Sequence, residues 1–417
     1  MLDAVCSDKS IVVESYDGHS MWLNTKAMEE FGINQDAVAK WGKDCVRVDS
    51  SGKPTGIISE APTFHVRANM KFSVEDMKKY LLAWQDLALS NGYTGAYNAG
   101  VEIVSKSEPL AFYELEKEGK LKYYAYSGSL LQDNTDTPEA DMDAVAAEAE
   151  AHNSKHYKLI GAKVFCDGVV EAHTAWLLDD YLDKPGYRGV SRFDDHKKMV
   201  RLIKAAEKHN MNVHVHSIGD ASTKAWIDAF AEAEEATGNF DMRNALAHLH
   251  IVRKEDVKRI ADYNIMAVAG MMWVGKEPGI FEQEVAYVGQ EKAERAYPIK
   301  SIIDYGGVLG SHSDFPVSPV FSVPWTVCLG ATGYLPSYGK SMIRHADQCL
   351  SRLDTLKALT INVAYMWHEE ERMGSLETGK LANLTVFDKD FMRDDFKDIE
   401  NAKCLATYVD GELVYNV

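Results

Sequence analysis

Four side chains of types that bind or assist metal ions follow apolar runs in the middle of the chain: Lys163, His216, His248 and Asp314. The interval from His216 to His248 matches one βα unit, and the interval from His248 to Asp314 matches two. Lys163 precedes His216 by one unit and a long loop. Because the ends of parallel strands meet at one face of a barrel, this spacing predicts that the four side chains converge.

Imidazole and carboxylate are standard ligands for zinc and the neighbouring divalent metals. We therefore predict a metal site of one or two ions, with zinc as the expected metal, formed by His216, His248, Asp314 and Lys163. A bound metal lowers the pKa of water to about 7, which supplies hydroxide at neutral pH. Asp314 is predicted to take the proton of that water and pass it to a leaving amine.

Lys163 is predicted to be catalytic, but its chemistry has two alternatives. A protonated ammonium group has three donors and no lone pair, so it cannot bind a cation. Lys163 is a metal ligand only if it is N-carboxylated and therefore anionic. Otherwise its ammonium group orients the substrate or stabilises developing negative charge.

The elements that must position these residues alternate along the chain as short β-type runs and amphipathic helices, which is typical of parallel βα units. Seven strands are predicted, at residues 93–98, 122–127, 159–165, 212–216, 245–248, 265–269 and 308–311. Eight strands close a TIM barrel. The predicted fold is therefore a TIM-like (β/α) barrel that lacks its first strand.

The two ends of the chain differ in character from this middle part. Residues 1–72 carry turn signals such as SSGKPTG and are predicted to form an irregular, pocket-bordering excursion within the barrel domain. Residues 73–370 are predicted to be the metal-hydrolase barrel. Residues 371–417 contain three strand-like runs and the hairpin signal Asp410-Gly411, which predict a small C-terminal β-sandwich remnant.

Composition excludes several functional classes. A net charge of −18 opposes binding to nucleic-acid phosphates. No apolar run approaches the roughly 18 residues of a membrane span, and the start of the chain lacks the features of a secretory signal. The six cysteines form no CxxC motif, which favours a reduced cytoplasmic location. The predicted partner is a small-molecule substrate, with no nucleic acid and no membrane.

At these residues the sequence resembles the third amidohydrolase family, which includes the N-substituted formamide deformylases. The matching segments are YDGHSMWLNTKAM, GKPTGIISE, GYTGAYNAG, KVFCDGVVEAHTAWLLDDY, HVHSIGDAS, AHLHIV, HSDFPV, TINVAYMWHEEERMGSLETGKLANLTVFDKD and VDGELVY. The resemblance implies a TIM-like barrel, a flanking β-sandwich and metal-assisted hydrolysis of carbon–nitrogen bonds other than peptide bonds.

The resemblance also implies roles for single residues. His216 and His248 look like the metal ligands of the fifth and sixth strands, Lys163 like the strand-four lysine, and Asp314 like the strand-eight aspartate. The predicted substrate-binding residues lie in the matched segments and are Asp17, His19, Trp22, Asn24, Asp167 and Asp220.

The chain also departs from the family pattern. Family members begin with a β-segment and a first barrel strand that carries an HxH metal pair, and this chain starts after both. Four positions differ from the residue that is usual in the family: Ala247 replaces Glu, His250 replaces Gln, His312 replaces Gly and Asn383 replaces Asp. Strand alternation predicts a shared face for His214 with His216, for His248 with His250 and for His312 with Asp314. The extra histidines either rebuild part of a metal site or are drift in an inactive relative.

Three functional hypotheses follow. The first is a metal-dependent hydrolase of non-peptide carbon–nitrogen bonds. The second is a truncated or catalytically inactive relative, because the HxH strand is absent. The third is a barrel that binds a small molecule without turnover. An open barrel edge would be covered by a homodimer partner, filled by another segment, or completed by a longer natural chain.

Overall fold

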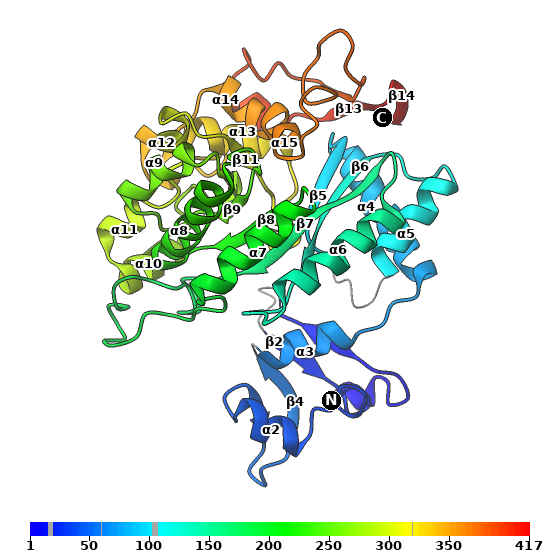
Figure 1. Ribbon diagram of the computed structural model, residues 1–417, viewed down its shortest axis with the longest axis vertical. Helices are drawn as coiled ribbons and strands as arrows, with labels where there is room; N and C mark the ends of the chain where they lie inside the picture. The colour runs from blue at the N-terminus through cyan, green and yellow to red at the C-terminus, as the bar shows by residue number, and fades with distance from the viewer. Residues whose placement is uncertain (16–19, 60, 102–106, 319) are drawn as a thin grey trace. The chain divides into compact units, whose positions relative to one another are not determined.

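The computed structural model describes residues 1–15, 20–59, 61–101, 107–318 and 320–417 (Figure 1). The chain forms two compact units. The small unit is built mainly from Met1–Ser73. The large unit runs from Val74 to Val417 apart from two short segments, and it contains all the parallel strands.

The small unit is a regular antiparallel sheet with the strand order β1-β2-β4-β3. Its strands are β1 (Val12–Glu14), β2 (Ser20–Leu23), β3 (Val46–Val48) and β4 (Pro54–Ser59), and its helices are α1 (Thr25–Glu30), α2 (Gln35–Trp41) and α3 (Ala61–Asn69). Met21, Leu23, Val46 and Ile58 belong to a core of its own. The prediction of irregular structure is therefore wrong here, because SSGKPTG contains the turn between β3 and β4, with Gly52 at φ +86°, and the first three residues of β4.

The large unit contains a curled sheet of seven parallel strands in the order β11-β10-β9-β8-β7-β6-β5, which follow one another across the sheet in chain order (Figure 1). They are β5 (Gly95–Val101), β6 (Tyr124–Leu130), β7 (Tyr157–Phe165), β8 (Asn212–Ser217), β9 (Ala245–His248), β10 (Met266–Ala269) and β11 (Leu309–Ser311). All seven predicted strands are confirmed to within a few residues.

Helices connect these strands and cover the sheet. They are α4 (Val74–Ser90), α5 (Ser107–Lys117), α6 (Pro138–His152), α7 (His196–Lys208), α8 (Asp220–Thr237), α9 (Lys254–Asp262), α10 (Ile280–Val288), α11 (Gln290–Glu294), α12 (Ile299–Asp304), α13 (Val323–Thr332), α14 (Arg352–Leu359), α15 (Ile361–Met366) and α16 (Phe396–Ile399). Strand β8 is buried at every position, as expected for a parallel strand with both faces covered.

Local sequence sets the ends of these helices. The Asp195 side chain accepts hydrogen bonds from the backbone N–H groups of Lys197 and Lys198 and so begins α7. Gly238 ends α8 in the left-handed conformation at φ 76°, as predicted for a C-terminal glycine. In the ranges described above, no helix combines the length and the apolar character that a bilayer crossing requires.

Among the described residues, β5 and β11 are the outer strands of the parallel sheet, since each pairs with one neighbour only. The Val308 carbonyl accepts from Ala267 on β10, so the next carbonyl, that of Leu309, points to the other edge of β11. The side-chain amide of Asn362 donates to this Leu309 carbonyl at 2.8 Å. A side chain from α15 thus satisfies part of the β11 edge.

The C-terminal strands β12 (Leu384–Phe387), β13 (Cys404–Val409) and β14 (Glu412–Asn416) form an antiparallel sheet of their own. The predicted hairpin at Asp410-Gly411 is confirmed, and both residues have positive φ, 53° and 81°. That this sheet is the remnant of a sandwich stays a prediction.

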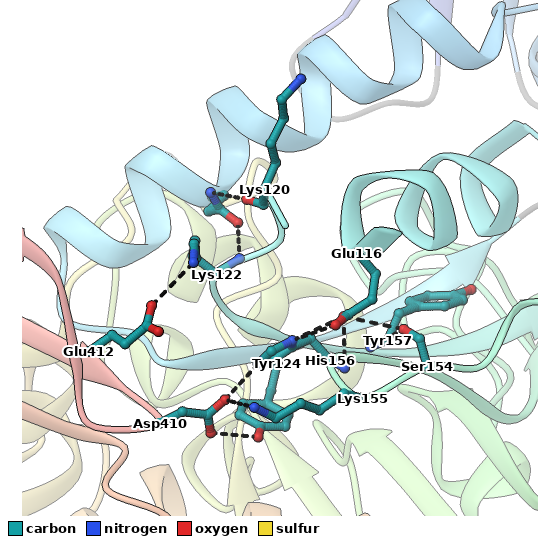
Figure 2. A network of polar contacts seen from close by, with 11 residues as sticks. Glu116, Lys120, Lys122, Tyr124, Ser154, Lys155, His156, Tyr157, Asp410 and Glu412 are labelled. Carbon is teal, nitrogen blue, oxygen red and sulfur yellow. Dashed lines mark hydrogen bonds and ion pairs between the residues drawn. The ribbon is translucent and has the colours of Figure 1, made fainter. Parts of the chain in front are cut away.

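A polar network holds this hairpin to the starts of two barrel strands (Figure 2). His156, just before β7, lies between two carboxylates, with Nε2 at 2.8 Å from Asp410 and Nδ1 at 3.0 Å from Glu116. Tyr124, the first residue of β6, donates its hydroxyl to Asp410 at 2.8 Å. The network lies where the strands begin, so it serves stability rather than chemistry at the strand ends.

Candidate metal centre

The histidines predicted to bind metal lie on adjacent strands of the large unit. His216 is in β8, and His248 is the last residue of β9, where it pairs in register with Ser217. Their ring centroids are 4.6 Å apart. Both side chains are nearly inaccessible to solvent. The structure therefore brings together the two imidazoles that unit spacing predicted to converge.

Asp167 fixes the orientation of His216. Its Oδ1 lies 3.1 Å from His216 Nδ1 and also accepts from the Ile218 N–H, while its Oδ2 accepts from Gly219 and Trp176. Donation from Nδ1 to a carboxylate leaves the lone pair of the neutral ring on Nε2, which is the form that binds metal. Asp167 thus lies behind His216, and its predicted contact with substrate stays a prediction.

The turn after β9 has an unusual backbone. His248 and Leu249 have φ values of 75° and 53°, and Asp314 after β11 has φ 51°. Residues with side chains rarely adopt this region, and such positions concentrate at functional sites. The turn also ends the strand alternation. The prediction that His250 shares a face with His248 is therefore wrong. His250 stacks on Tyr297 instead, with ring centroids 4.6 Å apart.

Two further rings surround His248. Trp273 stacks on it at 5.3 Å and an interplanar angle of 12°, and His312 meets it edge-on at 4.7 Å. Trp273 was not among the predicted site residues, although an aromatic residue shortly after a buried strand such as β10 was a usable signal. His312 was predicted only as one of the extra histidines that either rebuild part of a metal site or are drift in an inactive relative.

Lys163 in β7 is buried beside the same histidines. Its Nζ lies 3.4 Å from Nδ1 of His214. Burial lowers the pKa of Lys163 to about 8, while the carboxylates of Asp314 and Asp167 act in the opposite direction. Asp314 therefore lies close enough to Lys163 to interact electrostatically with it, as predicted for the end of β11.

Burial also favours the neutral form of three histidines in this region, His214, His248 and His312. It lowers the pKa of His312 to about 4, with Asp314 opposing the shift. It lowers the pKa of His248 and of His214 well below the usual value, and the neighbouring histidines and Lys163 lower both further. Neutral imidazoles carry the lone pairs that metal ions bind.

Two nitrogens of the cluster lack hydrogen-bond partners among the described residues, Nδ1 of His248 and Nε2 of His312. Two imidazoles on one zinc-like ion, at metal–nitrogen distances of about 2.1 Å and angles of 90–110°, have centroids about 4.5–5.2 Å apart. The His216–His248 and His248–His312 spacings of 4.6 and 4.7 Å agree with this range.

Within the described ranges, however, no three His, Cys, Asp or Glu side chains already stand in an arrangement that could hold a metal ion. The Cβ–Cγ bond of histidine points at the ring centre, so rotation about it redirects both nitrogens and barely moves the centroid. The donor types and the His216–His248 ring spacing suit a divalent cation. His216 and His248 would hold it, with Asp314 and Lys163 beside them.

The remaining predicted substrate-binding residues are Asp17, His19, Trp22, Asn24 and Asp220. Asp17 and His19 are outside the described residues. Trp22 is in β2 of the small unit, and Asn24 is the N-cap of α1. The Asn24 side chain accepts from Ile11 and Ala27 and donates to the carbonyls of Cys6 and Lys9. Asp220 accepts from the Leu178 N–H and from Lys292. Substrate binding by these residues stays a prediction.

A buried ion triad lies near the cluster. Glu284 in α10 forms an ion pair with Arg344 and lies 2.9 Å from Nε2 of His250. Burial alone would raise the pKa of Glu284, but His250 and Arg344 lower it to about 2. Arg344 also donates to the Ala293 carbonyl at 2.6 Å. The triad joins the connections that follow β9, β10 and β11.

The sequence profile of the Amidohydrolase family matches residues 1–415 of this chain. The chain belongs to this family. The amidohydrolase relatives include the putative amidohydrolase YtcJ of Bacillus subtilis, 24% identical over 99% of this chain and 75% of that protein. They also include the N-substituted formamide deformylase of Arthrobacter pascens, 26% identical over 99% of this chain and 75% of that protein.

A similar solved structure is that of an uncharacterized metal-dependent hydrolase from Pyrococcus horikoshii. It superposes with a TM-score of 0.74 at 22% identity and covers 95% of this chain and 74% of that one. This likeness supports the amidohydrolase fold. Together with the amidohydrolase relatives, it supports a hydrolase.

Proposed function

We propose that this chain is a hydrolase that uses a divalent metal ion to cleave carbon–nitrogen bonds of the non-peptide amide type. The observation that carries the proposal is the pair His216 and His248, whose rings lie 4.6 Å apart on adjacent strand ends while Asp167 orients one of them. The name of the formamide deformylase relative supports N-substituted formamides as the substrate class to test.

A bound divalent cation would supply a water molecule with a pKa near 7. In the proposal Asp314 accepts the proton of the attacking water and returns it to the leaving nitrogen. The carboxylate of Asp314 interacts with both Lys163 and His312, which supports its place among the reacting groups.

Lys163 keeps the two roles that its chemistry allows. Burial lowers the pKa of Lys163 to about 8, so free amine is more accessible near neutral pH than for an ordinary lysine. The free amine is the form that carbon dioxide can carboxylate, whereas the ammonium form stabilises negative charge on the substrate. Activity that depends on added bicarbonate favours the first role, and activity indifferent to it favours the second.

The test uses the full chain, stripped with a chelator and reloaded with Zn²⁺ or Mn²⁺. We expect metal-dependent release of formate from N-substituted formamides, and loss of that activity in Asp314→Asn. Asp304→Asn is the matched control, because Asp304 is an exposed residue of α12 paired with Lys300. A metal content near zero that neither ion raises contradicts the proposal, and hydrolysis of dipeptides alone contradicts its substrate class.

A further inference from the structure

We propose that the substrate carries a carboxylate on its nitrogen substituent, and that Arg192 binds this carboxylate across the ring of Phe165. This inference rests on the proposed function and deepens it, because it names the chemical class of the substituent. Among the N-substituted formamides it selects N-formylated amino acids. The contacts that carry it lie at the end of β7, beside His216.

Phe165, the last residue of β7, belongs to the concave face of the parallel sheet. It is in register with His216 on β8, and two residues earlier Lys163 is in register with His214. Residues in register on parallel strands point to one face, as do alternate residues of one strand. This face is the concave one, because the rings of Tyr97 on β5 and His214 on β8 are 5.1 Å apart although two strands lie between them.

The ring of Phe165 is partly exposed, whereas the residues before and after it in the chain are buried. Three polar groups lie around the ring. The His216 imidazole is 5.1 Å from its centroid, Nζ of Lys163 is 5.1 Å away and Cζ of Arg192 is 5.2 Å away. An apolar surface beside a few fixed polar groups is the usual composition of a small-molecule site. The ring therefore offers a support for the carbon chain of a substrate next to His216.

Arg192 is held in place at two points. Its backbone N–H donates to the Cys166 carbonyl at 2.7 Å, which keeps it next to the strand end, and its Nε donates to Asp133 at 2.8 Å. The side chain of Asp133 is 41% exposed, so water weakens the attraction, and the ion pair orients the guanidinium group more than it neutralises it. A guanidinium group in a fixed position suits the planar recognition of a carboxylate.

The ring of Phe165 links the proposed reaction centre to Arg192. Since the His216 ring and the Arg192 guanidinium group each lie about 5 Å from its centroid, they are at most about 10 Å apart. A substrate whose scissile bond lies near His216 therefore reaches Arg192 through a short carbon chain laid along the ring. A carboxylate at the end of that chain meets a positive charge, which a neutral alkyl group does not use.

The experiment compares the metal-loaded wild-type chain, Arg192→Gln and Arg188→Gln on matched pairs of formamides. Each pair consists of an N-formyl ω-amino acid and the N-alkylformamide of the same chain length without the carboxylate, and the chain is lengthened from N-formylglycine upwards. Arg188→Gln is the matched control, because Arg188 lies in the same loop and also pairs through Nε, with Asp180 at 2.9 Å. Formate release gives kcat and KM separately for each substrate.

We expect wild type and Arg188→Gln to prefer the carboxylate member of the pairs. In Arg192→Gln, KM for the carboxylates should rise by about 10–100-fold, the range that hydrogen bonds to a charged group contribute. Their kcat should stay unchanged, because a contact remote from the reacting bond stabilises the bound substrate and the transition state equally. KM for the neutral members should stay within about twofold of wild type, whereas a purely structural role of Arg192 would impair both series alike.

No preference for carboxylates in wild type, or a preference that persists in Arg192→Gln, overturns this inference and leaves the proposed function standing. A metal-loaded wild-type chain that hydrolyses neither series overturns the proposed function and this inference with it. If the glutamine variant does not fold, Arg192→Lys decides by the same ratio of KM values, because lysine keeps the charge and removes the planar donor pair.

Discussion

Replacing Asp167 with asparagine tests how strongly the structure depends on this buried carboxylate. The carboxylate is inaccessible to solvent and lies against four N–H groups, one from His216 and three from the backbone. Asparagine has nearly the same shape but keeps only one acceptor oxygen. At best it preserves the two hydrogen bonds made by one of the two oxygens.

The expected loss follows from this count. Hydrogen bonds to a charged group contribute about 1.5–3 kcal/mol each, so losing two lowers the free energy of unfolding by about 3–6 kcal/mol. If the amide oxygen stays on the side of Gly219, the amide nitrogen faces Nδ1 of His216. Two donors cannot face each other, so the ring moves its proton to Nε2. That tautomer has no lone pair for a metal at Nε2.

The assay is urea unfolding of the metal-free protein, with ¹⁵N chemical shifts of the histidine ring to report the tautomer and Co²⁺ titration to report affinity. Asp195→Asn is the matched control, because Asp195 also accepts backbone N–H groups, yet asparagine caps helices about as well. A loss below about 1 kcal/mol in Asp167→Asn, or an unchanged His216 tautomer, would refute the reasoning.

Three other predictions concern ionisable side chains that are not among the proposed metal ligands. Burial raises the pKa of Glu234 to about 8, so between pH 5 and 8 the native state holds a proton that the unfolded chain has released. Stability therefore falls by about 1.4 kcal/mol per pH unit as pH rises. Glu234→Gln should remove that slope, and stability curves that stay parallel to wild type would contradict it. Arg344→Met should lower the free energy of unfolding by about 3–5 kcal/mol, because Glu284 keeps a buried charge without its arginine partner; urea unfolding measures this. His156→Phe should speed limited proteolysis within residues 384–417, because the ring that lies between Asp410 and Glu116 no longer offers either carboxylate a nitrogen; an unchanged cleavage rate argues against that anchoring role.

The parallel strands could be predicted because each is a short buried run followed by a helix of clear periodicity. His216 and His248 could be placed together because β8 and β9 are consecutive, and consecutive parallel strands are neighbours in this sheet. The same argument predicted that Asp314 lies close enough to Lys163 to interact with it electrostatically. Asp314 follows β11, which is separated from β9 by β10.

Other features depend on contacts that sequence periodicity does not contain. The backbone N–H partners of Asp167 come from two separate loops, so nothing local indicated that it supports His216. Strand alternation predicted that His250 shares a face with His248. The left-handed turn at His248 and Leu249 changes the direction of His250. In the small unit, strands of three to six residues are too short for alternation to stand out against turn signals.

The triad of His250, Glu284 and Arg344 has a consequence for motion at the open end of the large unit. Its members come from the connections after β9, β10 and β11, and each charge has its partners in another connection. Separating the segment of Glu284 or that of Arg344 would leave a buried ion without its counter-ion, and His250 ties a third segment to Glu284. Amide hydrogen exchange in the three segments should therefore occur through a single cooperative opening with one shared free energy, not as independent fraying of three loops.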